Sequence, residues 1–178
     1  MKTFKEFNNI NEENTFTNEA DSGLEGVRTF KNGLSVEIIK EKYPWLLKAK
    51  FKNAVIGEDK RFGLVWYEGT WIDGTWESGI WKDGVWKSGT WYKGTWYEGT
   101  WEDGTWENGY FDNGTWENGT WKNGTWQNGE WYGGVWEDGH WLSGKWFGGK
   151  WKKGKWHIGY NGTSGKVIET YSDPNNFQ

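Results

Sequence analysis

The sequence predicts an all-β fold, a parallel β-solenoid whose interior is filled by tryptophan. Tryptophan recurs at every fifth position from Trp66 to Trp156, with Phe111 as the only substitute. Glycine follows each of these aromatic residues after three positions, from Gly69 to Gly159, and the residue after that glycine is most often threonine. An internal repeat of this regularity is typical of solenoids and related arrays.

A period of five residues is incompatible with a straight strand and with an α-helix. In a strand, an odd period would place successive tryptophans on opposite faces. In an α-helix, each tryptophan would be rotated by about 140° from the previous one and no apolar face would form. The chain must therefore bend once in each repeat, and dipeptides such as Asp73-Gly74 and Asn108-Gly109 supply the positive φ that tight turns need.

Two architectures bend at this interval, and the solenoid satisfies the backbone better. In an antiparallel meander of three-residue strands, which is the alternative, the residues on either side of each tryptophan point their backbone groups the same way but would have to serve opposite neighbours. In a parallel solenoid every repeat is one side of a coil, and tryptophan and glycine point inward. Buried indoles would then explain how a chain with 19 tryptophans and a mean hydropathy of −0.98 could be soluble.

Taken in order, the chain divides into four segments. Residues 1–25 are polar and aperiodic and are expected to form a flexible N-terminal tail. Residues 26–45 are expected to cap the solenoid with a short strand and a helix that starts after Ser35 and ends before Pro44. Residues 46–160 form the repeat, with a loop at residues 57–63 where Arg61 breaks the register, and residues 161–178 form a C-terminal cap strand and tail.

The predicted structural core consists of the residues that keep the five-residue register. Ala49 and Ala54 stand two residues before Phe51 and Ile56, where later repeats have glycine before tryptophan, as expected if core volume is conserved. The predicted core residues are Phe51, Ile56, Trp66, Trp71, Trp76, Trp81, Trp86, Trp91, Trp96, Trp101, Trp106, Phe111, Trp116, Trp121, Trp126, Trp131, Trp136, Trp141, Trp146, Trp151 and Trp156.

The units Ala49-Lys-Phe-Lys-Asn53 and Ala54-Val-Ile-Gly-Glu58 resemble the pentapeptide-repeat family. The stretch from Trp66 to Gly159 is similar to a Trp-Gly variant of that repeat in uncharacterised tailed-phage proteins, and the opening Met-Lys-Thr-Phe-Lys-Glu-Phe resembles N-termini from T-even-like phages. The resemblance implies a right-handed coil of about four sides, or twenty residues, and a place in a virion or the host cytoplasm. The residue after each tryptophan shows neither a fifteen- nor a twenty-residue period, so fifteen residues per coil is the alternative.

Nothing in the sequence indicates catalysis, and we predict no enzymatic activity, cofactor or metal. The chain has no cysteine, and its two histidines, His140 and His157, occupy variable positions of the repeat where surface residues are expected. The carboxylates follow the repeat and indicate a solvated surface. No apolar run is long enough for a signal peptide or a transmembrane segment.

Charge is distributed unevenly along the repeat. Residues 66–140 hold thirteen Asp and Glu against four Lys, whereas residues 141–160 hold five Lys and no acid. Apart from solubility, this asymmetry suggests a basic end that docks on an acidic protein, on nucleic acid or on a second copy. The residues of that end are Lys145, Lys150, Lys152, Lys153 and Lys155.

The function expected from these features is that of a non-catalytic structural or interaction protein, in a phage particle or an infected cell. A protein partner or self-association is expected, and no membrane. The alternative is a binding module, either an acidic mimic of DNA or a carbohydrate-binding surface. The aromatic residues that follow tryptophan should point outward and could stack on neighbouring coils as a sugar platform; they are Tyr67, Tyr92, Tyr97, Tyr132 and Phe147.

Overall fold

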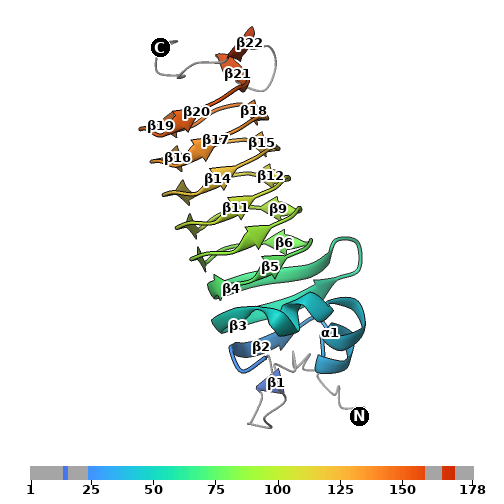
Figure 1. The fold of residues 1–178 in the computed structure, drawn as a ribbon. Helices are drawn as coiled ribbons and strands as arrows, with labels where there is room; N and C mark the ends of the chain where they lie inside the picture. Colours follow the sequence, from blue (N-terminus) through green and yellow to red (C-terminus); the bar gives the residue numbers. More distant parts are fainter. Residues whose placement is uncertain (1–13, 16–23, 159–165, 171–178) are drawn as a thin grey trace, which may run out of the picture.

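A computed structural model describes residues 14–15, 24–158 and 166–170 of the chain, with side chains for residues 24–157. Residues 24–158 form a parallel β-solenoid of about six coils that is capped at its N-terminal end by a helix and an antiparallel hairpin (Figure 1). The predicted fold class is therefore confirmed. The expected flexible tail lies outside the described residues, apart from strand β1 (Asn14–Thr15), which pairs with β2.

Each coil has three sides and fifteen residues. Every parallel strand pair within the repeat joins residues fifteen apart, for example Thr100 with Thr115 and Trp101 with Trp116. The expectation of four sides and twenty residues per coil is therefore wrong, and the alternative of fifteen is correct. The physical reason lies in the core, where three indoles per coil are in mutual edge contact and leave no space for a fourth.

We call the three sides A, B and C. Strand β4 (Gly63–Asp73) turns the first corner and starts both side A and side B. Side A continues through β6 (Ile80–Trp81), β9 (Thr95–Trp96), β12 (Tyr110–Phe111), β15 (Thr125–Trp126), β18 (His140–Trp141) and β21 (Gly154–Ile158). Side B continues through β7 (Val85–Trp86), β10 (Thr100–Trp101), β13 (Thr115–Trp116), β16 (Glu130–Trp131) and β19 (Lys145–Trp146). Side C consists of β5 (Thr75–Trp76), β8 (Thr90–Trp91), β11 (Thr105–Trp106), β14 (Thr120–Trp121), β17 (Val135–Trp136) and β20 (Lys150–Trp151).

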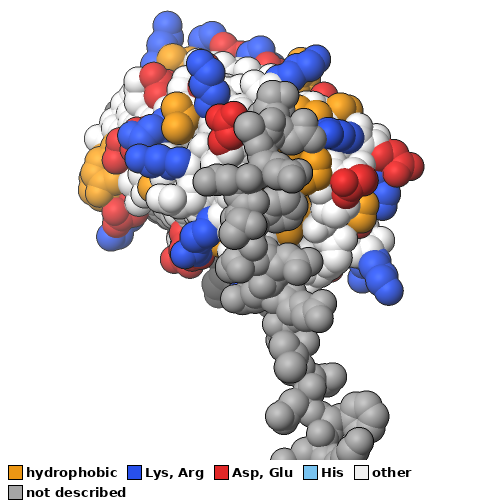
Figure 2. All heavy atoms as spheres, turned by 90° about the horizontal axis from the view of Figure 1, so that it is seen from below, with side chains coloured by type: hydrophobic (Ala, Val, Ile, Leu, Met, Phe, Trp, Pro, Cys, Tyr) orange, Lys and Arg blue, Asp and Glu red, His pale blue; other side chains and the backbone are white. Residues whose placement is uncertain are grey.

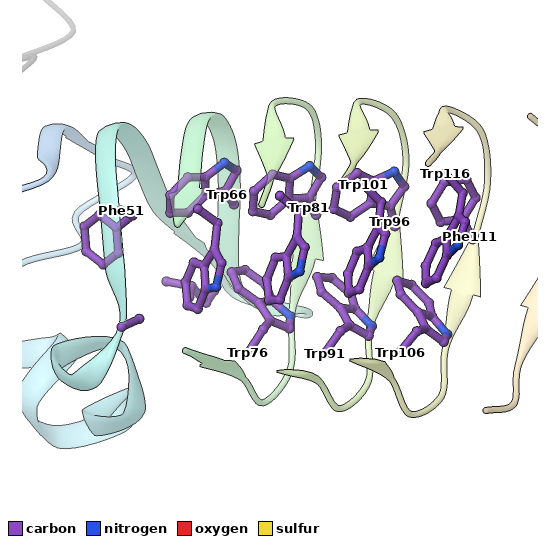
Figure 3. Close-up of a cluster of buried hydrophobic side chains, with 14 of the residues drawn as sticks. Phe51, Trp66, Trp76, Trp81, Trp91, Trp96, Trp101, Trp106, Phe111 and Trp116 are labelled. Atoms are coloured by element: carbon purple, nitrogen blue, oxygen red, sulfur yellow. The ribbon is translucent and has the colours of Figure 1, made fainter. Parts of the chain in front are cut away.

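The indoles form three continuous columns, one behind each side (Figure 3). Within a column, successive tryptophans stack with ring centroids 4.7–5.1 Å apart and ring planes 3–7° from parallel. Between columns, consecutive tryptophans meet edge to face at 5.6–6.1 Å and 70–77°. Both arrangements are favourable for aromatic rings. Of the predicted core residues all are buried except Trp156, which is partly buried in the last coil.

The glycines are required at the corners between sides. From Gly69 to Gly154 the corner glycines have φ between 97° and 143°, a region that side chains strongly disfavour. A Cβ on Gly104 would also lie 2.4 Å from the carbonyl oxygen of Gly89, the corresponding glycine of the preceding coil. The glycine therefore serves the stacking of coils as well as the turn.

Backbone hydrogen bonds join each coil to the preceding one. The N–H of the residue after tryptophan donates to the tryptophan carbonyl sixteen residues earlier, as from Tyr92 to Trp76 at 2.8 Å. The N–H of the residue after glycine donates to the earlier glycine carbonyl, as from Thr90 to Gly74 at 2.9 Å. Most strands of the coils have only two residues, so their positions are determined mainly by hydrogen bonds to the coils above and below them.

The predicted helix of the N-terminal cap is confirmed. Helix α1 (Val36–Lys42) starts after Ser35, whose hydroxyl accepts a hydrogen bond from the N–H of Ile38, and a 3₁₀-helix, η1 (Pro44–Lys48), follows it. The expected strand is present as β2 (Val27–Lys31). Trp45 of η1 packs against Trp71 and Trp76 and thereby closes the start of the columns.

The first sides of the solenoid differ from the prediction. Strand β3 (Lys50–Asp59) pairs antiparallel with β4, so the regular coils begin at β4 and not at residue 46. The predicted loop at residues 57–63 is shorter, since residues 57–59 belong to β3 and Gly63 to β4. Asp59 stabilises this turn, because its carboxylate accepts hydrogen bonds from the N–H groups of Arg61 and Phe62. At the other end, β22 (Lys166–Thr170) pairs antiparallel with β21, at the position of the predicted cap strand.

Burial of the indoles leads to a first prediction. The emission of the protein should be shifted to the blue and poorly quenched by acrylamide, because the repeat indoles from Trp66 to Trp136 have no exposed surface. Unfolding in guanidinium should shift the emission to the red and restore quenching. Emission at the wavelength of free tryptophan from the native protein would contradict the inward placement of the rings.

Candidate interaction surface

The outer surface consists of the residues on either side of each tryptophan and of the position before each corner glycine. The register of fifteen aligns these positions in ladders that run along the rod. Among the described residues no group of three or more His, Asp or Glu side chains is arranged to hold a metal ion. No helix among the described residues has the length and apolar character needed to cross a bilayer. These ladders make up the outer surface of the described coils.

Ion pairs between adjacent coils connect lysines with carboxylates fifteen residues away. The Nζ–O distances are 3.2 Å for Lys87–Glu102, 2.8 Å for Lys122–Glu107, 3.0 Å for Lys145–Glu130, 2.6 Å for Lys152–Glu137 and 2.7 Å for Lys153–Asp138. The hydrogen bond from Lys145 lowers the pKa of Glu130, and that from Lys153 lowers the pKa of Asp138. Since these pairs are exposed to solvent, each contributes little to stability, about 0–1 kcal/mol.

The ladder changes the interpretation of the predicted basic end. Lys145, Lys152 and Lys153 are each paired with a carboxylate of the preceding coil, and Lys150 and Lys155 lie on β20 and β21. The charges of Lys145, Lys152 and Lys153 are thus balanced locally. In the sequence, each of these lysines lies fifteen residues after its carboxylate partner. This spacing could be recognised as an ion pair only once the coil length was known.

The acidic residues do not gather on one side. Of the thirteen Asp and Glu between residues 66 and 140, four follow the core aromatic residues of side A, four those of side B and four those of side C, and Glu130 lies within strand β16 of side B. Seen from below, on the face that Figure 2 shows, basic and acidic side chains are interspersed. A mimic of DNA would need a concentrated acidic surface, and this distribution does not favour one.

The two histidines lie together, which the sequence reasoning missed. His140 Nδ1 and His157 Nε2 are 3.2 Å apart, and both residues are half-buried where β18 meets β21. They are seventeen residues apart and thus two positions apart on adjacent coils. Burial, followed by the nearby charges of His140 and Lys155, lowers the pKa of His157.

This pair predicts a loss of stability in mild acid. Because the pKa of His157 is lower in the folded protein than its ordinary value of 6.5, the unfolded chain binds the proton first as the pH falls. Stability should therefore be complete above pH 6.5 and decline below it, before the carboxylates titrate near pH 4. Thermal unfolding of the wild type and of His157→Gln at pH 7.5 and 5.5 checks this, and the variant should lose less stability. An equal loss in both proteins would contradict the role of the pair.

The outward aromatic residues are dispersed, with one exception. Tyr92 and Tyr97 are exposed on different sides, and Tyr67 is half-buried, with its hydroxyl accepting a hydrogen bond from Asn32 at 2.8 Å. Tyr132 and Phe147 stack on adjacent coils of side B, with ring centroids 4.7 Å apart and planes at 16°. Among the five predicted residues, only these two stack on each other across coils, and each ring covers one face of the other.

The described residues form a rod with an indole core and three laddered sides. No protein-family model, no curated protein and no solved structure matches the chain.

Proposed function

We propose that this protein is a non-catalytic structural and interaction protein that serves as a stiff rod in a bacteriophage particle or in the infected cell. The observation that supports this most is the continuity of the three indole columns, which pass through every coil from Trp66 to Trp151. A core that continues through every coil gives the protein a stiff, elongated shape. It also holds equivalent surface residues of adjacent coils at a fixed spacing of about 4.8 Å.

The surface chemistry supports an interaction role. Exposed large apolar residues occur on all three sides, among them Ile72, Tyr92 and Tyr97. Charged ladders of both signs separate them, which suits specific contact with a protein partner and disfavours indiscriminate association. The phage setting rests on the resemblance of the Trp-Gly repeat and of the opening residues to tailed-phage proteins.

Quantitative mass spectrometry of purified particles tests this proposal. Particles from the phage that carries this gene should contain the protein in a fixed copy number, and particles from a strain with the gene deleted should lack it and assemble or infect less efficiently. As a matched control, the particles should be washed at high salt, because a contaminant held by charge would be released. Absence from particles together with normal growth of the deletion strain would contradict the proposal.

A further inference from the structure

We propose that the column of indoles behind side C conducts an electron hole along the rod to Tyr43, where the phenol gives up an electron and passes its proton to Glu58. This electron-transfer activity goes beyond the proposed structural role and does not depend on it, since one copy of the chain contains the whole path. Three observations carry the inference: an unbroken series of ring contacts, indole N–H groups with no base beside them, and a phenol–carboxylate bond where the series ends.

The first observation is that this column runs without interruption from the last coil into the N-terminal cap. Its rings stack with centroids 4.8–5.1 Å apart, and they belong to Trp76, Trp91, Trp106, Trp121, Trp136 and Trp151 (Figure 3 shows the first three). In the cap, Trp45 lies 5.2 Å from Trp76, and Tyr43 lies 6.4 Å from Trp45. Electrons tunnel rapidly between rings in contact, and tryptophan and tyrosine are the aromatic side chains that are oxidised most easily. A hole can therefore pass from ring to ring along the whole series.

The second observation concerns an oxidised indole in the core. In water such an indole loses its N–H proton, which traps the hole on that ring. In this column the N–H groups of five indoles have no hydrogen-bond partner, so no base is beside them to take the proton: Trp76, Trp91, Trp106, Trp121 and Trp136. The hole therefore remains a cation that the next indole can neutralise with an electron, and no proton has to move at these steps.

The surroundings of the column favour a positive hole and give it a direction. An indole cation would lie between the faces of two neighbouring rings, which attract cations and offset part of the cost of burying a charge. Residues 66–140 carry thirteen Asp and Glu against four Lys, whereas residues 141–160 carry five Lys and no acid. This gradient drives a hole that enters at the last coil toward the N-terminal cap.

The third observation is the bond between Tyr43 and Glu58 where the series ends. The hydroxyl of the buried Tyr43 donates to Glu58 Oε1 at 2.9 Å. Burial and this bond raise the pKa of Tyr43 to about 12, so the phenol carries its proton before oxidation. An oxidised phenol is a very strong acid, so Glu58 accepts its proton even though a hydrogen bond from Lys42 lowers the pKa of Glu58. The neutral tyrosyl radical is more stable than an indole cation, so the hole stops at Tyr43.

The complete reaction balances in electrons and protons. A one-electron oxidant, a metal complex or a radical, takes an electron from Trp156, which is partly buried and lies 5.7 Å from Trp151. Each oxidised indole then takes an electron from its neighbour on the side of the cap. Tyr43 supplies the last electron, its O–H bond breaks, and the proton forms a new O–H bond with Glu58. The products are the reduced oxidant, a tyrosyl radical and a protonated carboxyl group.

Photochemical oxidation at a single point tests the inference. The chain has no cysteine, so Lys152→Cys provides one exposed thiol next to Trp151 for a ruthenium polypyridyl label. A light flash in the presence of an external electron acceptor oxidises the label, and transient absorption and electron paramagnetic resonance identify the radical that follows. We expect a tyrosyl radical that forms more slowly in D₂O, because a proton moves with the last electron. No tyrosyl radical would overturn the proposal.

Variants of the cap identify where the hole stops. In the labelled protein, Tyr43→Phe should abolish the tyrosyl signal and leave an indole radical, and Glu58→Gln should slow tyrosyl formation. Tyr132 provides the matched control, because its hydroxyl also donates to a carboxylate, at 2.9 Å, but its ring stacks on Phe147 outside the columns. Tyr132→Phe should leave the signal unchanged. A tyrosyl signal that survives Tyr43→Phe at full size would overturn the proposal.

A layer of phenylalanine tests whether the hole travels through the core. Phe111 shares its coil with only two core indoles, so Trp116→Phe together with Trp121→Phe places phenylalanine on all three sides between the label and Tyr43. Because phenylalanine is far harder to oxidise than tryptophan, the tyrosyl signal should be largely lost.

A second double variant is the matched control for this layer. With Trp86→Phe and Trp121→Phe every complete coil keeps at least one indole, and Trp116 still joins Trp131 to Trp101 at 4.7 Å on each side. The tyrosyl signal should persist, and equal signals in the two double variants would overturn the proposal. Unfolding in guanidinium checks that both remain folded, and Tyr43→Phe, which leaves every column intact, tests the proposal independently of them.

Discussion

Gly104→Ala should destabilise the protein by about 4 kcal/mol, or prevent it from folding. Gly104 has a φ of 123°, which costs about 1–3 kcal/mol for a residue with a side chain. The added Cβ would also lie 2.4 Å from the carbonyl oxygen of Gly89, and separating the two coils costs about another 1–3 kcal/mol. Backbone lies on both sides of this contact, so no side chain can move aside to relieve it. Chemical unfolding followed by far-UV circular dichroism measures the change.

Gly133→Ala is the matched control for this effect. Gly133 lies on the same rod but has an ordinary φ, and its Cβ would only meet the carbonyl oxygen of Glu117 at 3.3 Å. We expect a change of less than about 1 kcal/mol, since an alanine in compatible backbone also restricts the unfolded chain. Equal losses in the two variants would show that the corner conformation is not what makes glycine necessary.

Trp101→Ala should cost about 5 kcal/mol, the upper end of the range for removing a buried aromatic side chain. Trp101 stacks on Trp86 at 4.8 Å and on Trp116 at 4.7 Å, and meets Trp96 and Trp106 edge to face. These rings are held in register by the backbone ladders and cannot collapse into the space. The cavity should therefore remain, and equilibrium unfolding in guanidinium should show the full loss.

Trp101→Phe should cost much less, about 1 kcal/mol, for a reason specific to this core. The indole N–H groups of sixteen buried tryptophans, including Trp101, have no hydrogen-bond partner. Each unsatisfied N–H opposes folding by about 1–3 kcal/mol. Phenylalanine gives up ring area but removes this penalty, and Phe111 already occupies such a position between Trp96 and Trp126, at 5.6 and 4.2 Å. A loss as large for phenylalanine as for alanine would contradict this account.

The labelled indoles of Figure 3 all turn their nitrogen atoms toward the same end of the stack. This uniform orientation follows from identical repeats, since each ring meets the same neighbours as the ring before it. A ring turned by 180° about its Cβ–Cγ bond would stay parallel to its neighbours, but its six-membered ring would move to the other side and no longer overlap theirs. The area buried by the three columns therefore outweighs the unsatisfied N–H groups, which is why the repeat retains tryptophan.

The sequence by itself determined the class of fold, the direction of the indoles and the positions of the turns. The period of five and the glycine of each repeat, as at Trp101 and Gly104, favoured the solenoid, because of the two architectures that bend at that interval it pairs the backbone groups of every repeat in the same way and buries an aromatic residue each time. The N-cap at Ser35 and the helix before Pro44 were also local features, and local chemistry predicts them well.

Only the tertiary structure decided the number of sides per coil, because that number depends on how indoles pack across the axis. Three rings in edge-to-face contact fill a triangular coil, and no residue within one repeat encodes this. The pairs Lys145–Glu130, His140–His157 and Tyr132–Phe147 depend on the same number. They join residues fifteen or seventeen positions apart. The arrangement of the outer surface could therefore be predicted only once the number of residues per coil was known.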